Sequence, residues 1–247
     1  MKLYGLIGYP LGHSFSEKFF REKFAAEGIA DCRYRNFPIP SIEELPRMLA
    51  ENPDLRGFNI TIPYKQAVLP DLASLSEEAE AIGAVNCVSV SGKELVGYNT
   101  DAYGFRRSLL RLIGEERPGA LVLGTGGASR AVCYVLEQLG IDCRLVSRNA
   151  GEGRISYEEL TPEIVREREL IVNTTPLGTF PKVEECPDIP YEALTCRHYL
   201  YDLVYNPAVT EFLRRGAEHG ALTMNGYKML VGQAEKSWDI WTSAGKE

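Results

Sequence analysis

The sequence predicts an α/β protein of two domains, the second of them a Rossmann-like nucleotide-binding domain. Residues 1–100 alternate short apolar runs with amphipathic helical stretches. A glycine loop at residues 124–129 then joins a new apolar strand to a helix. The chain has 247 residues, of which 45% are hydrophobic and 25% charged, so it is long and apolar enough for two modest domains.

The first domain is expected to contain a mixed or parallel sheet with helices packed on it. Apolar runs bounded by Gly, Pro and polar residues predict its strands, and a 3.6-residue periodicity predicts its helices. A turn at residues 92–94 predicts a hairpin. The expected strands are 3–8, 32–37 and 57–62, the helices 16–27 and 41–52, and the hairpin arms 85–91 and 95–99.

A helix over residues 101–113, capped by Thr100 or Asp101, is expected to lead into the second domain. Strands and helices then alternate as in a nucleotide-binding domain. We expect the C-terminal helix to return to the first domain, giving domains of residues 1–101 with 226–247, and of residues 102–225. The later strands are expected at 120–123, 143–146, 170–172, 199–203 and 221–224, and the helices at 130–139, 208–219 and 227–241.

Charge and cysteine usage restrict the partners. The formal net charge of -7 argues against nucleic acid or an anionic membrane surface as partner, because such surfaces repel an acidic protein. The six cysteines are scattered without metal-ligand spacing, so we expect reduced thiols and no metal. No apolar run approaches the roughly 20 residues needed to span a bilayer. A cytoplasmic protein with a small-molecule substrate is expected.

The glycine loop is the first candidate binding site. Gly124, Gly126, Gly127 and Ala128 lie between an apolar strand and a helix, where glycines let the backbone approach a pyrophosphate at the helix N-terminus. Ser129 occupies the last position of the usual G-x-G-x-x-G/A pattern, so the match is imperfect. A tight strand-to-helix turn without a ligand is the alternative.

The end of the next strand indicates the cofactor. NAD-binding domains commonly carry an acidic residue there, which accepts hydrogen bonds from the ribose hydroxyls. This chain has Ser147 and Arg148 instead. A guanidinium binds a 2′-phosphate in a bidentate, charge-assisted way, so we predict NADP(H) rather than NAD. The alternative is that Arg148 is a solvated surface cation.

Several segments together resemble the shikimate dehydrogenase family. The resemblance implies reversible reduction of 3-dehydroshikimate to shikimate with NADPH, in the pathway to chorismate and the aromatic amino acids, by a monomer or homodimer. The segments are GYPLGHSFS (8–16), NITIPYK (59–65), GAVN (83–86), GYNTDAYG (97–104), the glycine loop, NTTPLG (173–178), DLVY (202–205) and GYKMLVGQ (226–233).

The resemblance also assigns roles to residues. It implies that Ser14 and Ser16 hold the substrate carboxylate. The remaining residues that it implies are Asn86, Tyr205 and Gln233 for substrate, and Thr174 and Gly226 for cofactor. For Ser16 a helix N-cap is an alternative or additional role, and for Tyr205 a buried core position. The chain departs from the family pattern at Glu17, Phe19, Phe20 and Cys87.

Lys65 and Asp101 are the candidate catalytic pair. Carbonyl reduction needs a proton donor as well as a hydride donor. Lys65 ends an apolar segment and Asp101 follows a strand, so the carboxylate could hold the ammonium by a charge-assisted bond. The family resemblance assigns this pair to catalysis and leaves open which residue makes the formal proton transfer. A surface lysine and a helix N-cap are the alternatives.

Asn59 and Thr61 alternate with apolar residues, so both side chains are expected on one strand face, where they could meet substrate hydroxyls. A half-buried strand would show the same pattern.

Two other functions fit the same sequence. A quinate or quinate/shikimate dehydrogenase would share the fold and the Lys65/Asp101 pair, although Ser147 and Arg148 argue against an NAD-linked one. A non-catalytic sensor of a pathway ligand would bind without turnover. Retention of the catalytic pair together with the glycine loop argues against the sensor.

Overall fold

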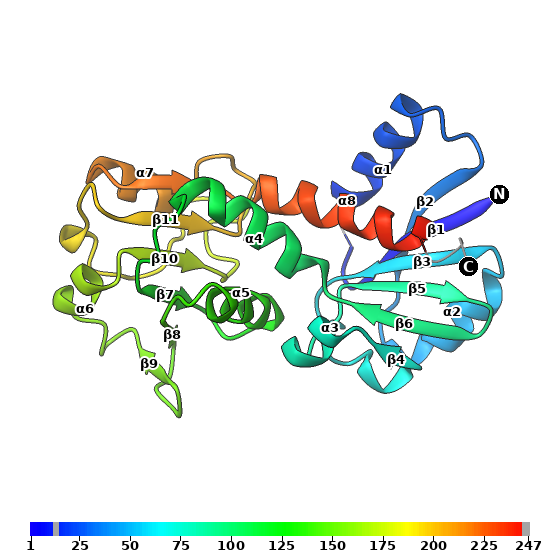
Figure 1. The fold of residues 1–247 in the computed structure, drawn as a ribbon, viewed down its shortest axis with the longest axis horizontal. Helices are drawn as coiled ribbons and strands as arrows, with labels where there is room; N and C mark the ends of the chain where they lie inside the picture. Colours follow the sequence, from blue (N-terminus) through cyan, green and yellow to red (C-terminus); the bar gives the residue numbers. More distant parts are fainter. Residues whose placement is uncertain (12–14, 244–247) are drawn as a thin grey trace. The chain divides into compact units, whose positions relative to one another are not determined.

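The computed structural model describes residues 1–11 and 15–243, and the chain forms two compact units (Figure 1). The first unit is Met1–Thr100 with Gln233–Glu247, and the second is Asp101–Gly232. Residues 226–232 were expected in the first domain but belong to the second unit. Gly226 donates a backbone hydrogen bond to the Val204 carbonyl and packs directly against the Leu203 carbonyl, which leaves no room for a Cβ.

The first unit contains a six-stranded mixed sheet in the order β2-β1-β3-β5-β6-β4. β1 runs parallel to both β2 and β3, whereas β5 is antiparallel to β3 and β6. The predicted mixed sheet and hairpin are therefore confirmed. The strands are β1 (Lys2–Gly8), β2 (Cys32–Pro38), β3 (Leu55–Ile60), β4 (Ser74–Leu75), β5 (Cys87–Ser91) and β6 (Glu94–Tyr98).

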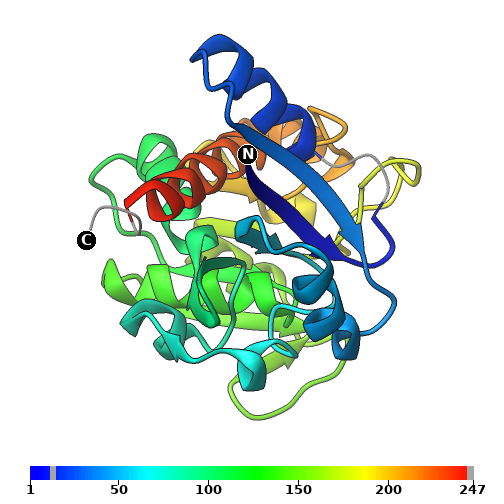
Figure 2. The same ribbon diagram turned by 90° about the vertical axis from the view of Figure 1, so that its right-hand side faces the viewer.

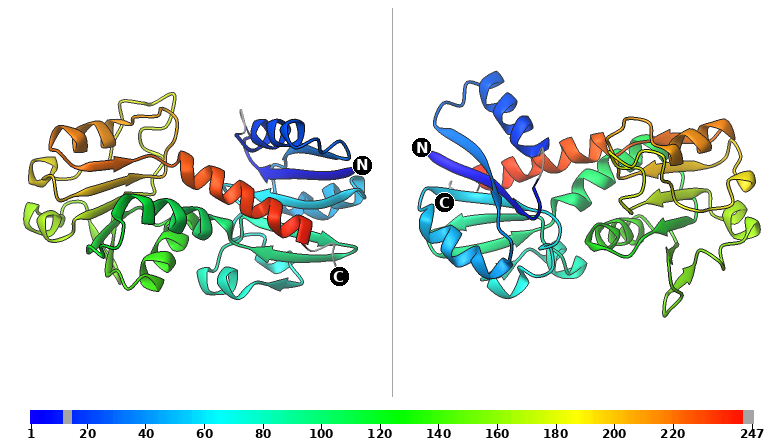
Figure 3. Two further views of the ribbon diagram at one scale, coloured as in Figure 1. Left: turned by 45° about the horizontal axis from the view of Figure 1, so that its top comes forward. Right: turned by 180° about the vertical axis from the view of Figure 1, so that it is seen from behind.

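Helices cover both faces of this sheet. On one face lie α1 (Phe15–Ala26) and the later part of α8 (Tyr227–Ser243) (Figures 2 and 3). Their side chains share an aromatic cluster that includes Tyr4, Phe20 and Trp241. Trp241 Nε1 donates to the Val88 carbonyl at 2.9 Å. The opposite face packs against η1 (Ile42–Glu44), α2 (Leu45–Glu51), η2 (Leu69–Asp71) and α3 (Glu77–Ile82).

The second unit contains a six-stranded sheet in the order β12-β11-β10-β7-β8-β9, with every pair parallel. Read from β9, the chain order is 3-2-1-4-5-6, the order of dinucleotide-binding Rossmann folds. The predicted Rossmann-like domain is confirmed. The strands are β7 (Ala120–Leu123), β8 (Cys143–Ser147), β9 (Arg154–Ser156), β10 (Leu170–Asn173), β11 (Tyr199–Asp202) and β12 (Leu222–Met224).

Helices pack on this sheet as well. α6 (Pro162–Glu167), η3 (Tyr191–Ala193) and α7 (Glu211–Glu218) share a core with the side chains of one face. On the other face, Tyr201 of β11 contacts α4 (Thr100–Ile113), with its ring edge-on to Phe105 and its hydroxyl 2.6 Å from Ser108 Oγ. α5 (Gly127–Gln138) packs against β7 and β8.

Three predicted boundaries are wrong for local reasons. β3 ends at Ile60, because Thr61 begins a turn in which its carbonyl accepts from the Tyr64 N–H at 3.0 Å, so Asn59 and Thr61 do not share a strand. α4 begins at Thr100, so neither Thr100 nor Asp101 is its N-cap. α7 begins at Glu211, because Thr210 accepts a hydrogen bond from the Leu213 N–H. Within the described residues, no helix is long and apolar enough to cross a membrane.

Candidate active site

The first unit gathers predicted substrate residues around a buried polar network. Asn59, on β3, accepts a hydrogen bond from the Tyr34 hydroxyl at 3.0 Å. Its Nδ2 donates to the Asn86 carbonyl at 3.2 Å and to Ser237 Oγ at 2.8 Å. Asn59 is therefore tied to β2, to the segment before β5, and to α8.

Asn86 continues this network. Its Oδ1 accepts from the Thr100 N–H at 2.6 Å and lies 3.2 Å from the Thr100 hydroxyl. Its Nδ2 donates to Gln233 Oε1 at 3.1 Å. The Asn86 side chain is buried, at 3% exposure, whereas Gln233 is half-buried. The structure thus brings Asn59, Asn86 and Gln233 together, as three linked amides.

Ser16 joins the same network through Tyr34. The two hydroxyl side chains share a hydrogen bond, and burial holds the pKa of Tyr34 well above its usual range. Ser16 lies inside α1, which begins at Phe15, so Ser16 is not the N-cap of that helix. Ser14, the other predicted carboxylate ligand, lies outside the described residues.

Thr61 and Lys65 follow β3 in a turn. The Thr61 N–H donates to the Ile7 carbonyl at 2.9 Å, and the Lys65 carbonyl accepts from the Val85 N–H at 2.7 Å. Asp101, 2% exposed, directly follows Thr100 in the first turn of α4. The backbone at Lys65 is thus fixed beside the segment that carries Asn86, and Asp101 follows a residue bonded to Asn86.

The glycine loop lies at the switch point of the second sheet, where chain order reverses between β7 and β10. Gly124 has a φ of +108°, and a Cβ there would meet Thr174 Oγ1 at 2.7 Å. The Thr174 hydroxyl donates to the Leu123 carbonyl at 2.6 Å. Ligands of open α/β sheets bind at such points, outside the carboxyl ends of the strands.

The N-terminus of α5 has the properties of an anion site. Gly126 is its N-cap and supplies no capping side chain, and a Cβ on Gly126 would meet nothing within 4 Å. Gly127 and Ala128 form the first turn. Ser129 is buried and donates to the Gly126 carbonyl at 2.6 Å, so it stabilises the turn from inside. These residues fit a pyrophosphate, because the backbone N–H groups of a helix N-terminus lack partners within the helix.

Ser147 ends β8, and its hydroxyl donates to the Asn149 carbonyl. Arg148 follows as an exposed side chain. This exposure leaves the Arg148 guanidinium accessible to a phosphate group from solvent.

Two further predicted residues lie in the second unit. Tyr205 is 37% exposed rather than part of the core, and burial of part of its ring raises the pKa of its hydroxyl. Gly226 is buried before α8, and its carbonyl accepts from the Leu230 N–H at 2.9 Å. Among residues 1–11 and 15–243, no group of three His, Cys, Asp or Glu side chains is placed to hold a metal ion.

The family follows from comparison with known proteins. Residues 6–88 match the family model described as the shikimate dehydrogenase substrate binding domain. The curated shikimate dehydrogenase (NADP(+)) of Carboxydothermus hydrogenoformans is 37% identical over 262 residues, which cover 98% of this chain and 91% of that protein. The chain belongs to the shikimate dehydrogenase family. The predicted family membership is therefore confirmed.

Solved structures of this family share the fold over nearly the whole chain. The shikimate 5-dehydrogenase of Thermus thermophilus, in complex with NADP(H) and shikimate, matches with a TM-score of 0.86 and 33% identity, covering 98% of this chain and 94% of that one. The quinate dehydrogenase of Corynebacterium glutamicum, in complex with NAD, matches with a TM-score of 0.87 and 28% identity, covering 98% and 94%.

Three residues that belong to this hydrogen-bond network were not identified from the sequence. Ser237 is four residues after Gln233 on a predicted helix, so helical spacing could have placed both on one face. Thr100 was considered only as a helix cap. Tyr34 gave no signal, because its partner Asn59 comes from another strand.

A separate hollow of about 1310 Å³ lies in the first unit at the amino ends of β1 and β3, and its lining includes Lys2, Leu55 and Trp238. The candidate substrate residues lie at the carboxyl end of β3 and beyond, so this hollow is not the candidate active site.

Proposed function

We propose that this shikimate dehydrogenase family member is an NADP-dependent oxidoreductase that reversibly reduces 3-dehydroshikimate to shikimate. The observation that carries the proposal is similarity over 98% of the chain to a curated NADP(+)-dependent shikimate dehydrogenase. The linked amides of the first unit and the phosphate-compatible loop of the second support it.

The reaction is a hydride transfer combined with a proton transfer. NADPH, when bound, supplies a hydride to the carbonyl carbon of the substrate. Lys65 stabilises the negative charge that develops on the carbonyl oxygen and relays a proton to it, with the Asp101 carboxylate orienting the ammonium. The anchored backbone at Lys65 and at Thr100 supports this assignment, since catalytic side chains need rigid supports.

The substrate is a carboxylate that carries several hydroxyl groups. We assign its carboxylate to Ser14 and Ser16, and its ring oxygens to Thr61, Asn86 and Gln233. Neutral amides suit a polyol, because an amide can donate and accept. Tyr205 contributes a partly exposed hydroxyl to substrate binding.

The cofactor is assigned to the carboxyl end of the second sheet. Gly124, Gly126, Gly127 and Ala128 would hold the pyrophosphate at the N-terminus of α5. Ser147 and Arg148 would hold the 2′-phosphate. Thr174 and Gly226 would line the remainder of the site.

A four-way assay tests the proposal. The purified protein is mixed with shikimate or quinate and with NADP or NAD, and the absorbance of the reduced nicotinamide is followed. Turnover with shikimate and NADP, faster than with any other pair, is expected. Faster turnover with quinate and NAD would assign the chain to the activity named for the Corynebacterium glutamicum relative. Shikimate binding without turnover would favour the sensor.

A further inference from the structure

Two backbone groups fix the hydrogen-bond direction of the network in the first unit. The Asn86 carbonyl can only accept, so the Asn59 atom 3.2 Å from it is the nitrogen Nδ2. Asn59 Oδ1 then faces Tyr34, whose hydroxyl donates to it. The Thr100 N–H can only donate, so Asn86 turns its oxygen toward Thr100 and its nitrogen toward Gln233 Oε1.

A count of amide hydrogens separates Asn59 from the other two residues. Asn59 Nδ2 has two hydrogens, and the Asn86 carbonyl and Ser237 Oγ accept both. Asn86 Nδ2 uses one hydrogen for Gln233 and retains the other. Gln233 Nε2 has no acceptor among the described residues. Asn86 and Gln233 therefore retain N–H groups for a ligand, whereas both Asn59 hydrogens are used inside the protein.

Ser237 joins these groups from α8. It is fully buried, and its hydroxyl donates to the Gln233 carbonyl at 2.9 Å while accepting from Asn59 at 2.8 Å. Its oxygen also lies 3.3 Å from Thr100 Oγ1. One hydroxyl thus connects α8 with β3 and the start of α4.

We infer that Ser237 is a positioning residue, and that the half-buried Asn59 holds the network together rather than binding the substrate. Without the Ser237 hydroxyl, the Asn59 hydrogen that points at this fully buried position loses its acceptor, and a donor left without a partner there favours rearrangement of the amide. The side-chain amides of Asn86 and Gln233 are then no longer held in one orientation. Their free N–H groups no longer point consistently at acceptor oxygens of the substrate. The inference rests on the proposed function, which takes Asn86 and Gln233 as substrate ligands.

The test compares Ser237→Ala with Thr242→Ala. Thr242 is a matched control, because its hydroxyl also donates to the carbonyl four residues earlier on α8, at 2.8 Å, but is exposed and outside the network. We expect Ser237→Ala to raise the KM for shikimate about tenfold, the factor that corresponds to one ordinary hydrogen bond, with a smaller change in kcat and an unchanged KM for NADP. Ser237→Cys retains a weak donor and acceptor. We therefore expect its KM for shikimate to lie between the values for Thr242→Ala and Ser237→Ala.

The outcomes are distinguishable. Equal shikimate KM values for Ser237→Ala and Thr242→Ala, or equal rises in the KM for shikimate and for NADP, would overturn the positioning role. Lack of turnover by the unsubstituted protein would refute the proposed function instead. Shikimate titration calorimetry on the same variants then decides the inference, and equal or undetectable binding counts against it.

Discussion

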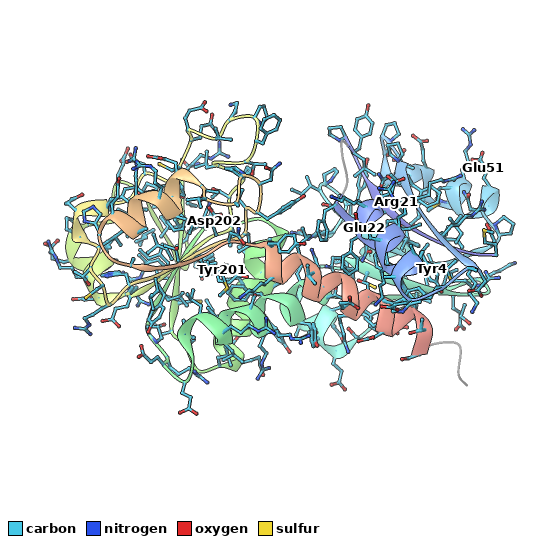
Figure 4. The ribbon with its side chains drawn as sticks, turned by 90° about the horizontal axis from the view of Figure 1, so that it is seen from above. Tyr4, Arg21, Glu22, Glu51, Tyr201 and Asp202 are labelled. Carbon is cyan, nitrogen blue, oxygen red and sulfur yellow. The ribbon has the colours of Figure 1, made fainter. Side chains whose placement is uncertain are left out.

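The carboxylate of Asp202, labelled in Figure 4, accepts a hydrogen bond from the Thr210 hydroxyl at 2.6 Å. Asp202 has no solvent exposure. Its other oxygen accepts from Asn173 Nδ2 at 2.9 Å and from the Val204 N–H at 3.0 Å. Asn173 Oδ1 in turn accepts from the Thr175 N–H at 3.0 Å. One buried carboxylate therefore joins the two loops that follow β10 and β11, beside the predicted cofactor residue Thr174.

Asp202 is expected to make stability depend on pH. Burial raises the pKa of Asp202 from its ordinary 3.8 to about 6, although its three hydrogen bonds oppose this rise. The folded protein then binds the proton more tightly than the unfolded chain, so stability falls as the pH rises from about 4 to about 6. The size is on the order of 2–3 kcal/mol, at about 1.4 kcal/mol per unit.

Urea unfolding of Asp202→Asn between pH 4 and pH 7 checks this expectation. The asparagine has no titratable group, so its stability should lose this decline with pH, whereas the exposed control Asp239→Asn should retain it. Parallel pH profiles for the wild type and Asp202→Asn would contradict the raised pKa.

Arg148 tests the choice of cofactor. Replacing Arg148 by Gln removes the charge that would meet the 2′-phosphate, and loss of a hydrogen bond to a charged group costs roughly 1.5–3 kcal/mol. The KM for NADP should rise about tenfold or more, and the KM for NAD should change little. Steady-state kinetics give both values. Arg144→Gln is the control, since Arg144 is an exposed arginine on β8, the strand that Arg148 follows. If both substitutions changed the KM for NADP equally, Arg148 would be a solvated surface cation without a role in cofactor binding.

Gly126→Ala separates folding from phosphate binding. A Cβ at Gly126 meets nothing within 4 Å, and the φ there is -80°, so alanine should fold as well as glycine. A methyl group at a helix N-terminus would nevertheless stand where a pyrophosphate approaches the backbone. The KM for NADP should rise severalfold at an unchanged thermal midpoint.

Gly119→Ala is the matched control for that substitution. Gly119 directly precedes β7, and a Cβ there would lie 3.6 Å from its nearest neighbour, Arg168, which is ordinary van der Waals contact. If Gly126→Ala and Gly119→Ala bound NADP equally well, the glycine loop would be a structural turn only.

Lys65→Met tests the proposed proton relay. The substitution retains a long side chain and removes the ammonium, and general acid catalysis typically contributes roughly 10²–10⁴ in rate. We expect kcat to fall by about this factor, with a much smaller change in the KM for NADP. Lys93→Met, in the exposed turn between β5 and β6, is the control. Near-normal turnover by Lys65→Met would remove Lys65 from catalysis.

The strongly patterned elements were predictable from the sequence. β7 lies at residues 120–123 as expected, because four consecutive apolar residues are bounded by Gly on both sides. The six-residue helices α3 and α6 and the short strands β4 and β9 were missed. Elements of this length offer too few residues for a periodicity to be recognised.

The candidate site shows the same division. Motif residues such as Asn86 and Gln233 could be found from the sequence, but the bond between Asn59 and Ser237 joins residues on β3 and α8 that only the folded chain brings together. The same is true of Tyr34 and Ser16. Hydrogen-bond direction, which decides whether an amide is available to a ligand, depends on these tertiary contacts.

Product formation from 3-dehydroshikimate is the decisive measurement for the proposed activity. The wild-type protein is incubated with 3-dehydroshikimate and NADPH, and both NADPH consumption and the product are quantified, the latter by NMR. We expect one shikimate to form for each NADPH consumed, with much slower consumption of NADH. Tight binding of 3-dehydroshikimate without consumption of either cofactor would contradict it.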